Sequence, residues 1–525
     1  MARIKVLDCT LRDGGYCNAW HFGEKNIRRI SSGLVDAGVE IIELGFITNR
    51  IVYDRNASKY TTVGEAAKMI PSNRKDKLFV CMINYGEYNA EDIPPMEGSS
   101  IDGIRVAFHK KDRVPALEFC KKIMEKGYKV FIQAMVTLSY TDEEFLDLIR
   151  RVNEVAPDAF YIVDSFGVMK KKDLIRLFYM VDNNLNPNIP IGFHSHNNLQ
   201  LAYSNAQNLT EIQGQREIII DCSVFGMGRG AGNLNTELFV EYLNDNIGTQ
   251  YLLKPLLIII DEILNEFYQQ NYWGYSLPNY LSAKHNAHPN YAAFLEAKQT
   301  LTVENMDAIF YMMDSEKKFE FNKNYVEELY IKYMTAGKTH SEHLSGFKSL
   351  IAGREVLIIA PGRSTLEEKD KVIACSRRED VVTISINFDF AEADTDYIFL
   401  SNLRRYRELD SEKRNKCIVT SNIPAVDVYL QTEYKELMNS FEAVEDNAGM
   451  MLIKLLIKLG ARKIMIAGID GYSVDPDNNF TDQRMRFYTK KAVFEAMNEG
   501  LNAAMAEFSK LIDIEYVTTP KYVRI

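Results

Sequence analysis

The chain has 525 residues, more than one hydrophobic core usually serves, so we expect at least two domains. Hydrophobic residues make up 46% of it and charged residues 26%, which excludes a largely disordered or collagen-like chain. The formal net charge of -10 provides no basic field for nucleic acid or for an anionic membrane, so we expect neither partner.

The apolar runs and the cysteines indicate the compartment. The N-terminal residues enter the run RIKVLD directly, without the pattern of a secretion signal. The most apolar later run, YLLKPLLIII, is broken by Lys254 and Pro255 and is too short to span a bilayer. The 7 cysteines include no Cys-x-x-Cys pair, so neither a disulfide framework nor a thiolate zinc site is predicted. We therefore expect a cytoplasmic protein.

The first half of the sequence alternates short β-branched runs with longer amphipathic stretches, which is typical of βα units around a parallel sheet. The stretch at 141–157 opens on Thr141 and Glu144, a capping-box pattern that predicts a helix start. About eight such units over about 230 residues predict a (β/α)₈ TIM barrel, with an open doubly wound sheet as the alternative. The predicted strands are residues 4–8, 39–46, 77–84, 103–108, 129–135, 159–164, 189–196 and 218–226.

Two further regions follow the predicted barrel domain, which covers residues 1–235. Residues 236–346 carry a helical pattern without strand signals, and we expect a helical extension of the barrel. Residues 347–525 alternate again and are predicted to form a separate, open Rossmann-like α/β domain. Its strand-like runs are residues 354–364, 381–387, 396–402, 416–422, 463–471 and 514–519.

Polar side chains gather at the ends of the predicted barrel strands. Barrel enzymes build their sites on the loops at the C-terminal ends of the strands, and packing alone explains charged residues there poorly. A convergent site is therefore predicted from residues 8–13, Glu43, Arg105, Gln133, Asp164, Ser165, His194 and His196.

The stretch GFHSHNN supplies the strongest signal for a metal. Residues two apart on a strand face the same way, so His194 and His196 can reach one point. Asp13 is a candidate third ligand, because its loop lies beside the seventh and eighth strands once a barrel closes. Two imidazoles and a carboxylate suit Mn²⁺, Co²⁺ or Zn²⁺, and Mg²⁺ less well; Mn²⁺ is the ion we expect. The alternative interpretation is one hydrogen-bonded barrel histidine and one loop histidine.

These residues resemble the pattern of the DRE-TIM metallolyase superfamily, a group of metal-dependent barrel aldolases, lyases and Claisen-type synthases. The resemblance rests on Asp8, Arg12 and Asp13 in LDCTLRDG, Glu43 in IIELGF, both histidines of HSHNN, and Asn233 in GMGRGAGN. It implies that Asp13, His194 and His196 bind the metal and that Asn233 is an additional ligand or supports one. The glycine-rich stretch is most similar to that of the 4-hydroxy-2-oxovalerate aldolases, which are class II pyruvate aldolases, although glycines there can also simply permit a tight turn.

The resemblance implies chemistry on a 2-oxo acid. Such an acid can bind the metal through its carboxylate and ketone oxygens, and the metal stabilises the enolate left when the C3–C4 bond breaks. Arg12 is expected to stabilise the same developing oxyanion, and Glu43 is expected to be catalytic as well. The residues expected to bind substrate are Asp8, Arg105, Gln133 and Ser165.

The proton carrier is the point at which the sequence departs from that subgroup. The aldolases place a histidine base shortly after the Arg-Asp pair, where this chain has Tyr16. Either His21 reaches in from further along the loop, or Tyr16 acts through a metal-bound water, since an unperturbed phenol is a poor base at neutral pH. A surface position for His21 is the alternative. Tyr291 in HPNYAAFL corresponds to a tyrosine that the aldolases bring to the site; otherwise it packs on the barrel at a helix start, with His288 beside it as a weaker candidate.

In the C-terminal region, Gly362 and Ser364 stand at a predicted helix N-terminus, where backbone amides can receive a phosphate, and Asp470 ends another strand. A nucleotide or nucleotide-sugar ligand there, or a role in assembly, stays open, because the sequence contains neither Gly-x-Gly-x-x-Gly nor a Walker lysine. This region replaces the usual C-terminal arrangement of the aldolase subgroup, so neither its aldehyde dehydrogenase partner nor acetaldehyde as product is carried over.

We therefore expect a divalent-metal-dependent aldolase that cleaves or forms a 4-hydroxy-2-oxo acid through a pyruvate enolate, assembled as a homo-oligomer. One alternative is an acyl-CoA-dependent Claisen-type synthase that joins acetyl-CoA to a 2-oxo acid. The other is a non-catalytic barrel that serves as a binding module.

Overall fold

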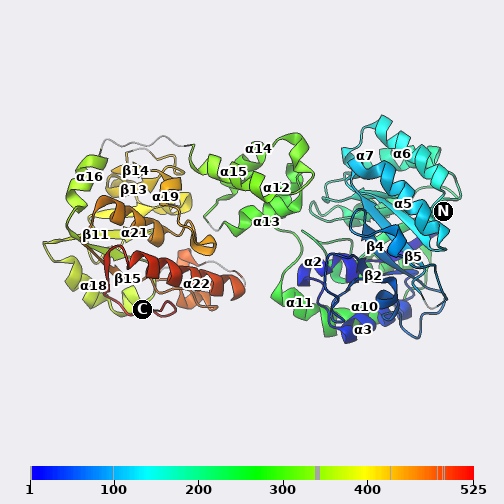
Figure 1. Cartoon of the computed structure of the whole chain (residues 1–525), viewed down its shortest axis with the longest axis horizontal. Helices are drawn as coiled ribbons and strands as arrows, with labels where there is room; N and C mark the ends of the chain where they lie inside the picture. The colour runs from blue at the N-terminus through cyan, green and yellow to red at the C-terminus, as the bar shows by residue number, and fades with distance from the viewer. Residues whose placement is uncertain are drawn as a thin grey trace. The chain divides into compact units, whose positions relative to one another are not determined.

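The computed structural model describes residues 3–98, 100–298, 300–336, 343–425, 427–481, 483–486, 489 and 491–524. The chain divides into two compact units, shown in Figure 1. Unit 1 consists of Met1–Phe294 and Met313–Phe321, and unit 2 consists of Leu295–Met312 and Asn322–Ile525. The three-part division expected from the sequence, with boundaries after residues 235 and 346, stays a prediction.

Unit 1 contains a closed barrel of eight parallel strands, which confirms the predicted fold class. The strands follow one another around the barrel as β1-β2-β4-β5-β6-β7-β8-β9, and β9 pairs with β1 to close it. A two-residue strand, β3, pairs with the end of β2 and was not expected. The bounds are β1 Arg3–Asp8, β2 Ile41–Ile47, β3 Lys59–Tyr60, β4 Leu78–Asn84, β5 Gly103–Phe108, β6 Lys129–Ala134, β7 Ala159–Asp164, β8 Ile191–Ser195 and β9 Glu217–Cys222.

Helices lie outside these strands, as Figure 1 shows for α5, α6 and α7. The helix expected at residues 141–157 is α6, and its capping box between Thr141 and Glu144 is formed. The bounds in the barrel region are α1 Thr10–Asp13, α2 Gly15–Asn18, α3 Glu24–Ala37, α4 Val63–Ala67, α5 Arg113–Glu125, α6 Asp142–Val155, α7 Lys171–Asn184 and α8 Ala202–Thr210.

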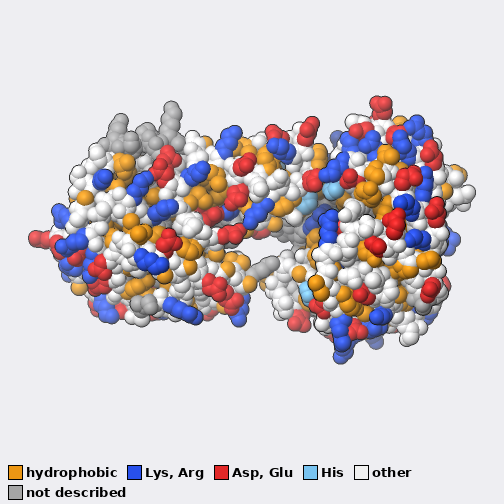
Figure 2. All heavy atoms as spheres, viewed as in Figure 1, with side chains coloured by type: hydrophobic (Ala, Val, Ile, Leu, Met, Phe, Trp, Pro, Cys, Tyr) orange, Lys and Arg blue, Asp and Glu red, His pale blue; other side chains and the backbone are white. Residues whose placement is uncertain are grey.

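After the barrel the described residues form helices without a strand until β10, in line with the helical pattern of the sequence. They are α9 Thr236–Ile247, α10 Leu253–Ile259, α11 Asn265–Gln270, α12 Leu277–Lys284, α13 Pro289–Ala297, α14 Val303–Tyr311, α15 Lys323–Met334 and α16 Leu344–Ile351. Within the described ranges, no helix combines the length and apolar character that crossing a membrane requires. Figure 2 shows acidic and basic side chains interspersed over the visible face of each unit.

Unit 2 contains an open sheet of seven parallel strands, in the order β14-β13-β12-β11-β10-β15-β16. The chain runs outward from β10 to β14, and α21 then returns it to the other side of β10, so the strand order reverses between β10 and β15. The three-residue strand β14 was not expected. The strands are β10 Glu355–Ile359, β11 Val381–Ile386, β12 Tyr397–Leu400, β13 Cys417–Thr420, β14 Leu430–Thr432, β15 Lys463–Ala467 and β16 Asp513–Tyr516. The helices are α17 Ser364–Glu367, α18 Lys369–Ser376, α19 Leu403–Glu408, α20 Tyr434–Leu437, α21 Ala448–Leu459 and α22 Lys491–Phe508.

The interior of the barrel changes from apolar to charged over one step of two residues. Ile41 and Ile219 belong to an apolar cluster of buried barrel residues. Two residues further along the same strands, and therefore on the same face, stand the buried Glu43 and Asp221. Charged groups are thus placed toward the carboxyl ends of the strands, where the βα loops begin.

A glycine on β8 makes room for the ring beneath this charged group. A Cβ at Gly192 would lie 2.4 Å from ring atoms of Tyr161, a fully buried residue of β7. The guanidinium of Arg105 in turn lies over the Tyr161 ring, 4.9 Å from its centroid. Any larger residue at position 192 would therefore displace the Tyr161 ring, against which the buried guanidinium of Arg105 packs.

We predict that Gly192→Ala lowers the free energy of unfolding by about 1–3 kcal/mol, because the added methyl group overpacks the interior against Tyr161. Both tryptophans, Trp20 and Trp273, belong to unit 1, so urea unfolding followed by their fluorescence reports on this unit. Gly64→Ala is the matched control, since nothing lies within 4 Å of a Cβ there, and it should be at least as stable as the native chain. Equal stability of Gly192→Ala and the native chain would contradict this packing.

Candidate metal centre

Three buried side chains converge at the carboxyl ends of the barrel strands. Asp13 ends α1, directly after β1, while His194 lies in β8 and His196 one residue beyond it. Their ligand atoms all lie within 4.8 Å of one another. The two imidazole centroids are 5.2 Å apart, on the same face of the strand as their spacing predicts. The chain thus contains a buried Asp/His/His cluster with the geometry of a metal site.

Unpartnered polar atoms at this cluster fit a bound cation. The Nδ1 atom of His196 lies 3.7 Å from an oxygen of Asp13 and is buried, and no described group forms a hydrogen bond to it. Burial lowers the pKa of His196 to about 3, which leaves the imidazole neutral and able to bind a metal at neutral pH. The side chain of Asn233 donates to Asp13, and its Oδ1 atom is likewise buried without a partner in the described part of the chain. Two nitrogens and two oxygens suit a divalent ion.

The glycine-rich loop brings Asn233 to the cluster. A Cβ at Gly228 would lie 2.1 Å from Nδ2 of Asn233 and 2.9 Å from an oxygen of Asp13. The close approach of these two side chains therefore requires glycine at 228. Positive φ angles at Gly230 and Gly232 show that the loop also uses glycine for its turn, which is one of the two interpretations of this motif.

A buried network of charges lies against the ligands. Asp221 in β9 accepts a hydrogen bond from Nδ1 of His194 at 2.9 Å, with the ring nitrogen taken as protonated, and also from Arg105. Arg105 donates its other terminal nitrogen to Glu43 at 2.7 Å, and Glu43 accepts from Arg12 at 2.9 Å. Holding Nδ1 of His194 in this way leaves its Nε2 for a metal, because the two ring nitrogens then have separate roles.

The charges of this network lower the pKa values of two of its carboxyl groups. Burial alone would raise the pKa of Asp13, but its electrostatic interactions with His196 and Arg12 outweigh burial and hold that pKa well below its usual range. The pKa of Asp221 is lowered in the same way, since Arg105 outweighs burial. Among the guanidinium and carboxylate groups named here, two cations meet three anions. This excess of one negative charge favours a cation at this end of the barrel.

The residues expected to bind substrate occupy different surroundings. Asp8 accepts from the backbone N–H of Thr10 and from the hydroxyl of Thr236, so both its carboxylate oxygens are engaged within the protein. Arg105 is fully buried in the ionic network. Gln133 is buried, with an Nε2 that no described group accepts. Ser165 accepts from the N–H of Val136. Of the four, Gln133 therefore has the donor best suited to a ligand, and the roles of all four stay predictions.

Tyr16 and His21, weighed as proton carriers, and Tyr291, expected to reach the site, are placed apart. Tyr16 lies at the barrel mouth, where the guanidinium carbon of Arg229 stands 5.5 Å from the centroid of the tyrosine ring. His21 contacts the carbonyl of Ala19 and the carboxylate of Asp54, and 59% of its side chain is exposed, so the structure does not bring it to the metal cluster. Tyr291 is buried and donates to the carbonyls of Lys317 and Glu320. Only Tyr16 of these three stands near the site.

Asp221, Arg229 and His288 were missed or ranked too low from the sequence. Asp221 carries the same signal as Glu43, a charged residue inside an apolar strand run, and that signal could have found it. Arg229 donates to the carbonyl of Ser165 at 3.0 Å, and its Nη1 lies 3.5 Å from Nε2 of His288. Burial, and next to it the charge of Arg229, lowers the pKa of His288 to about 2, so this imidazole is neutral. No periodicity marks these loop residues.

In unit 2, the amides expected to receive a phosphate are bonded within the protein. The N–H of Gly362 donates to the carbonyl of Gly468 at 3.0 Å. The N–H and hydroxyl of Ser364 both donate to the carboxylate of Asp470. Asp470 therefore caps α17, a helix of 4 residues. A ligand role for these three residues stays a prediction.

Comparisons with known proteins agree with this geometry. The sequence matches the HMGL-like family profile over residues 109–256. A 4-hydroxy-2-oxovalerate aldolase of Geobacillus genomosp. 3 is 30% identical over 246 residues, which are 46% of this chain and 70% of the relative. This chain belongs to the HMGL-like family of DRE-TIM metallolyases. The resemblance seen in the sequence is thereby confirmed.

Other relatives of this HMGL-like chain match it over similar lengths. A 4-hydroxy-2-oxovalerate aldolase of Pelotomaculum thermopropionicum is 28% identical over 244 residues, or 46% of this chain and 70% of the relative. An oxaloacetate decarboxylase of Mycobacterium tuberculosis is 25% identical over 250 residues, or 45% of this chain and 69% of the relative. Among solved structures, the N-terminal domain of a Bacteroides vulgatus protein is 28% identical, with a TM-score of 0.48, covering 56% of this chain and 96% of that one.

We predict that Asp221→Asn weakens Mn²⁺ binding by about 10–100-fold, because His194 loses the carboxylate that fixes its orientation. Calorimetric titration of the apoprotein with Mn²⁺ measures the change. Asp158→Asn is the control, since Asp158 precedes β7 at the opposite end of the barrel and accepts from the N–H of Val130. Unchanged affinity in folded Asp221→Asn would show that Asp221 does not position a metal ligand.

Proposed function

We propose that this HMGL-like protein is a divalent-metal-dependent carbon–carbon lyase, an aldolase that cleaves or forms a 4-hydroxy-2-oxo acid through a pyruvate enolate. One observation carries the proposal. The buried guanidinium of Arg12 donates to Asp13 and Glu43, while its Nη2 atom has no partner in the described part of the chain. A fixed cation with one unused donor thus stands beside a cluster that can hold a metal.

The proposed substrate class follows from the relatives. The substrates in their names, 4-hydroxy-2-oxovalerate and oxaloacetate, are both 2-oxo acids. Breaking the C3–C4 bond of either leaves the same three-carbon fragment, the enolate of pyruvate. A site that stabilises this enolate supports both names, so the enolate is the part of the chemistry that we infer first.

A metal held by Asp13, His194 and His196, with Asn233 beside them, would supply Lewis-acid stabilisation of the enolate oxygen. Mn²⁺ is the ion we propose. Arg12 contributes a preorganised donor to the same oxygen, and its network with Glu43 prevents it from turning away. Burial would lower the pKa of Arg12, but Glu43 and Asp13 outweigh it and raise that pKa, so the guanidinium stays charged. Gln133 presents a further donor for a substrate oxygen.

The reaction requires two proton transfers, and the groups at the barrel mouth are the candidates for them. In cleavage the C4 hydroxyl gives up its proton, the C3–C4 electron pair moves onto the enolate, and C3 later takes up a proton to yield pyruvate. Burial of its hydroxyl raises the pKa of Tyr16, although 42% of the residue surface is exposed, so Tyr16 is a neutral donor at neutral pH. The imidazole of His288 lies beside Arg229, and its pKa of about 2 makes it a poor base at neutral pH. We infer that Tyr16, rather than His21 or Tyr291, donates the proton that C3 takes up, and that the C4 hydroxyl releases its proton to water at the open barrel mouth.

The proposal predicts that the protein with Mn²⁺ exchanges the methyl protons of pyruvate with D₂O, and that His194→Ala loses this exchange. NMR of pyruvate measures it directly. No exchange with metal demonstrably bound would contradict a pyruvate enolate. Release of free thiol from acetyl-CoA with a 2-oxo acid would then support the Claisen-type synthase, and its absence would leave a binding module.

A second prediction separates the roles of Arg12 and His21. Arg12→Lys keeps a positive charge but loses the planar fork, and we expect pyruvate exchange to fall about 10²–10³-fold, the usual cost of one oxyanion donor. His21→Ala removes a surface side chain and should change the rate less than about twofold. Manganese binding is measured in both variants. A large loss of exchange in His21→Ala would show that the loop brings this residue to the substrate.

A further inference from the structure

Arg229 differs from the other two arginines of the barrel site in its partners. Arg12 and Arg105 are buried and bonded to carboxylates of the ionic network. Arg229, in the loop after β9, is only partly buried, and no carboxylate of the described residues forms an ion pair with it. An accessible guanidinium without a countercharge can bind an anionic ligand without first breaking an ion pair.

The loop places Arg229 beside both the metal cluster and Tyr16. Its neighbour in the chain, Gly228, packs against Asp13, since a Cβ at 228 would lie 2.9 Å from a carboxylate oxygen of that residue. The guanidinium carbon of Arg229 stands 5.5 Å from the centroid of the Tyr16 ring. A substrate that is held at the cluster and receives a proton from Tyr16 would therefore lie next to Arg229.

A second hydrogen-bond donor faces Arg229. The Nδ1 atom of His288 accepts from the backbone N–H of Asn290 at 3.1 Å. A neutral imidazole has one N–H, so a histidine that accepts at Nδ1 carries its proton on Nε2. This Nε2 atom lies 3.5 Å from Nη1 of Arg229, which also carries protons. Two donors thus stand side by side, and neither can accept a hydrogen bond from the other.

The protein holds both donors in place. Arg229 donates from Nη2 to the carbonyl of Ser165 at 3.0 Å. The backbone N–H of His288 donates to the carbonyl of Lys318 at 2.8 Å, and its ring packs edge-on against Phe166 with the centroids 5.7 Å apart. Fixed donors that converge without an acceptor of their own suit an oxyanion, because one oxygen between Nη1 and Nε2 would accept from both.

The proposed function indicates which part of the substrate carries this anion. It places the 2-oxo acid end at the metal cluster and gives Tyr16 the proton transfer to C3. A group beside Tyr16 then belongs to the half of the substrate that begins at C4 and leaves as the aldehyde. We propose that Arg229 and His288 bind a carboxylate carried by this aldehyde half. The substrates are then 4-hydroxy-2-oxo acids with a second acid group, an assignment that rests on the proposed function.

Two 2-oxo acids that cannot be cleaved test the donor pair. On C4, 2-oxoglutarate has a carboxylate where 2-oxopentanoate has a methyl group, and neither has the C4 hydroxyl that cleavage requires. In calorimetric titrations of the Mn²⁺-loaded full chain, we expect 2-oxoglutarate to bind about 10–100-fold more tightly, because its second carboxylate gains charge-assisted hydrogen bonds. Equal affinity of the two acids, or no binding of either at millimolar concentration, would overturn the proposal.

Variants assign the preference to these two residues. Arg229→Met should lower the ratio of the two affinities to about one, while Arg229→Lys keeps the charge and should retain part of the preference. His288→Asn can still accept from the N–H of Asn290 but loses the Nε2 donor, and should lower the ratio about 3–10-fold. Arg50→Met, in the exposed loop after β2, is the control and should keep the native ratio. With folding verified by circular dichroism, a native ratio in Arg229→Met or in His288→Asn would overturn the assignment.

Pyruvate exchange separates this inference from the proposed function. A native chain that exchanges the methyl protons of pyruvate but does not prefer 2-oxoglutarate would keep the proposed function and overturn the inference. A chain that prefers 2-oxoglutarate but does not exchange pyruvate would contradict the proposed function, and it would overturn the assignment of the carboxylate to an aldehyde half.

Discussion

The ion pair between Arg105 and Asp221 is the constraint on which the rest of the barrel site depends. Both side chains are withdrawn from water inside the barrel, so each charge is tolerable only while its partners remain. Removing one partner of such a buried pair costs about 3–5 kcal/mol, because the other charge is left uncompensated. Arg105 packs over the Tyr161 ring, and that ring needs glycine at position 192. Asp221 in turn accepts a hydrogen bond from Nδ1 of His194. Packing at the centre of the barrel and ligand geometry at its mouth are therefore one connected arrangement.

The same network holds its charged groups in fixed positions at the carboxyl ends of the strands. Arg12 and Arg105 share Glu43, and Arg12 also contacts Asp13, so the guanidinium groups are fixed by carboxylates rather than by solvent. The three carboxylates of this network outnumber its two guanidinium groups, and this excess of negative charge favours a cation at this end of the barrel. Such preorganisation matters because donors already fixed in a dry interior need no rearrangement when charge develops. The Nη2 atom of Arg12 is the donor of this arrangement that no described group uses.

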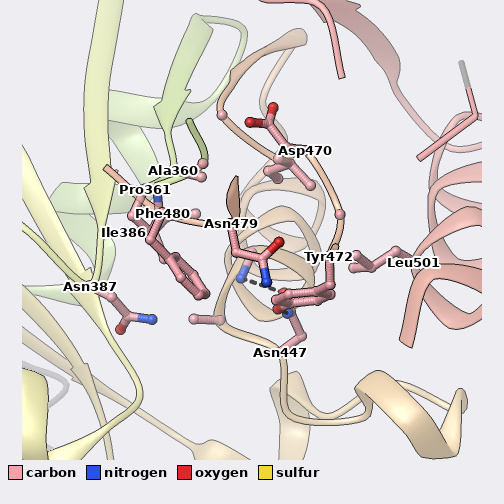
Figure 3. A pocket seen from close by; sticks show the side chains of 16 residues that line it. Ala360, Pro361, Ile386, Asn387, Asn447, Asp470, Tyr472, Asn479, Phe480 and Leu501 are labelled. Atoms are coloured by element: carbon pink, nitrogen blue, oxygen red, sulfur yellow. Dashed lines mark hydrogen bonds between the residues drawn. The ribbon is translucent and has the colours of Figure 1, made fainter. Parts of the chain in front are cut away.

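The two units of this HMGL-like chain arrange the carboxyl ends of their parallel strands differently. In the barrel all eight strands point their ends to one opening, so residues far apart in sequence converge on a single centre. In the open sheet of unit 2 the ends diverge only where the strand order reverses, and a small pocket there is lined by a few turns and the N-terminus of α21 (Figure 3). The turns after β10 and β15 are in contact, since a Cβ at Gly362 would lie 2.1 Å from the carbonyl oxygen of Gly468.

The sequence by itself determined the fold class of both regions, because β-branched runs alternating with amphipathic helices have few other solutions. It also determined the Asp/His/His cluster, since His194 and His196 are fixed two residues apart on a strand and Asp13 follows the first strand. Only the tertiary structure decided which charged residues support which others. Asp221 and Glu43 look alike in sequence, yet Asp221 holds His194 and Glu43 holds two arginines, because their partners depend on the strands that close around them. Loop positions were hardest to predict: His21 turns to Asp54, while Arg229 and His288 meet at the barrel mouth, since loops carry no periodicity that fixes the direction of a side chain.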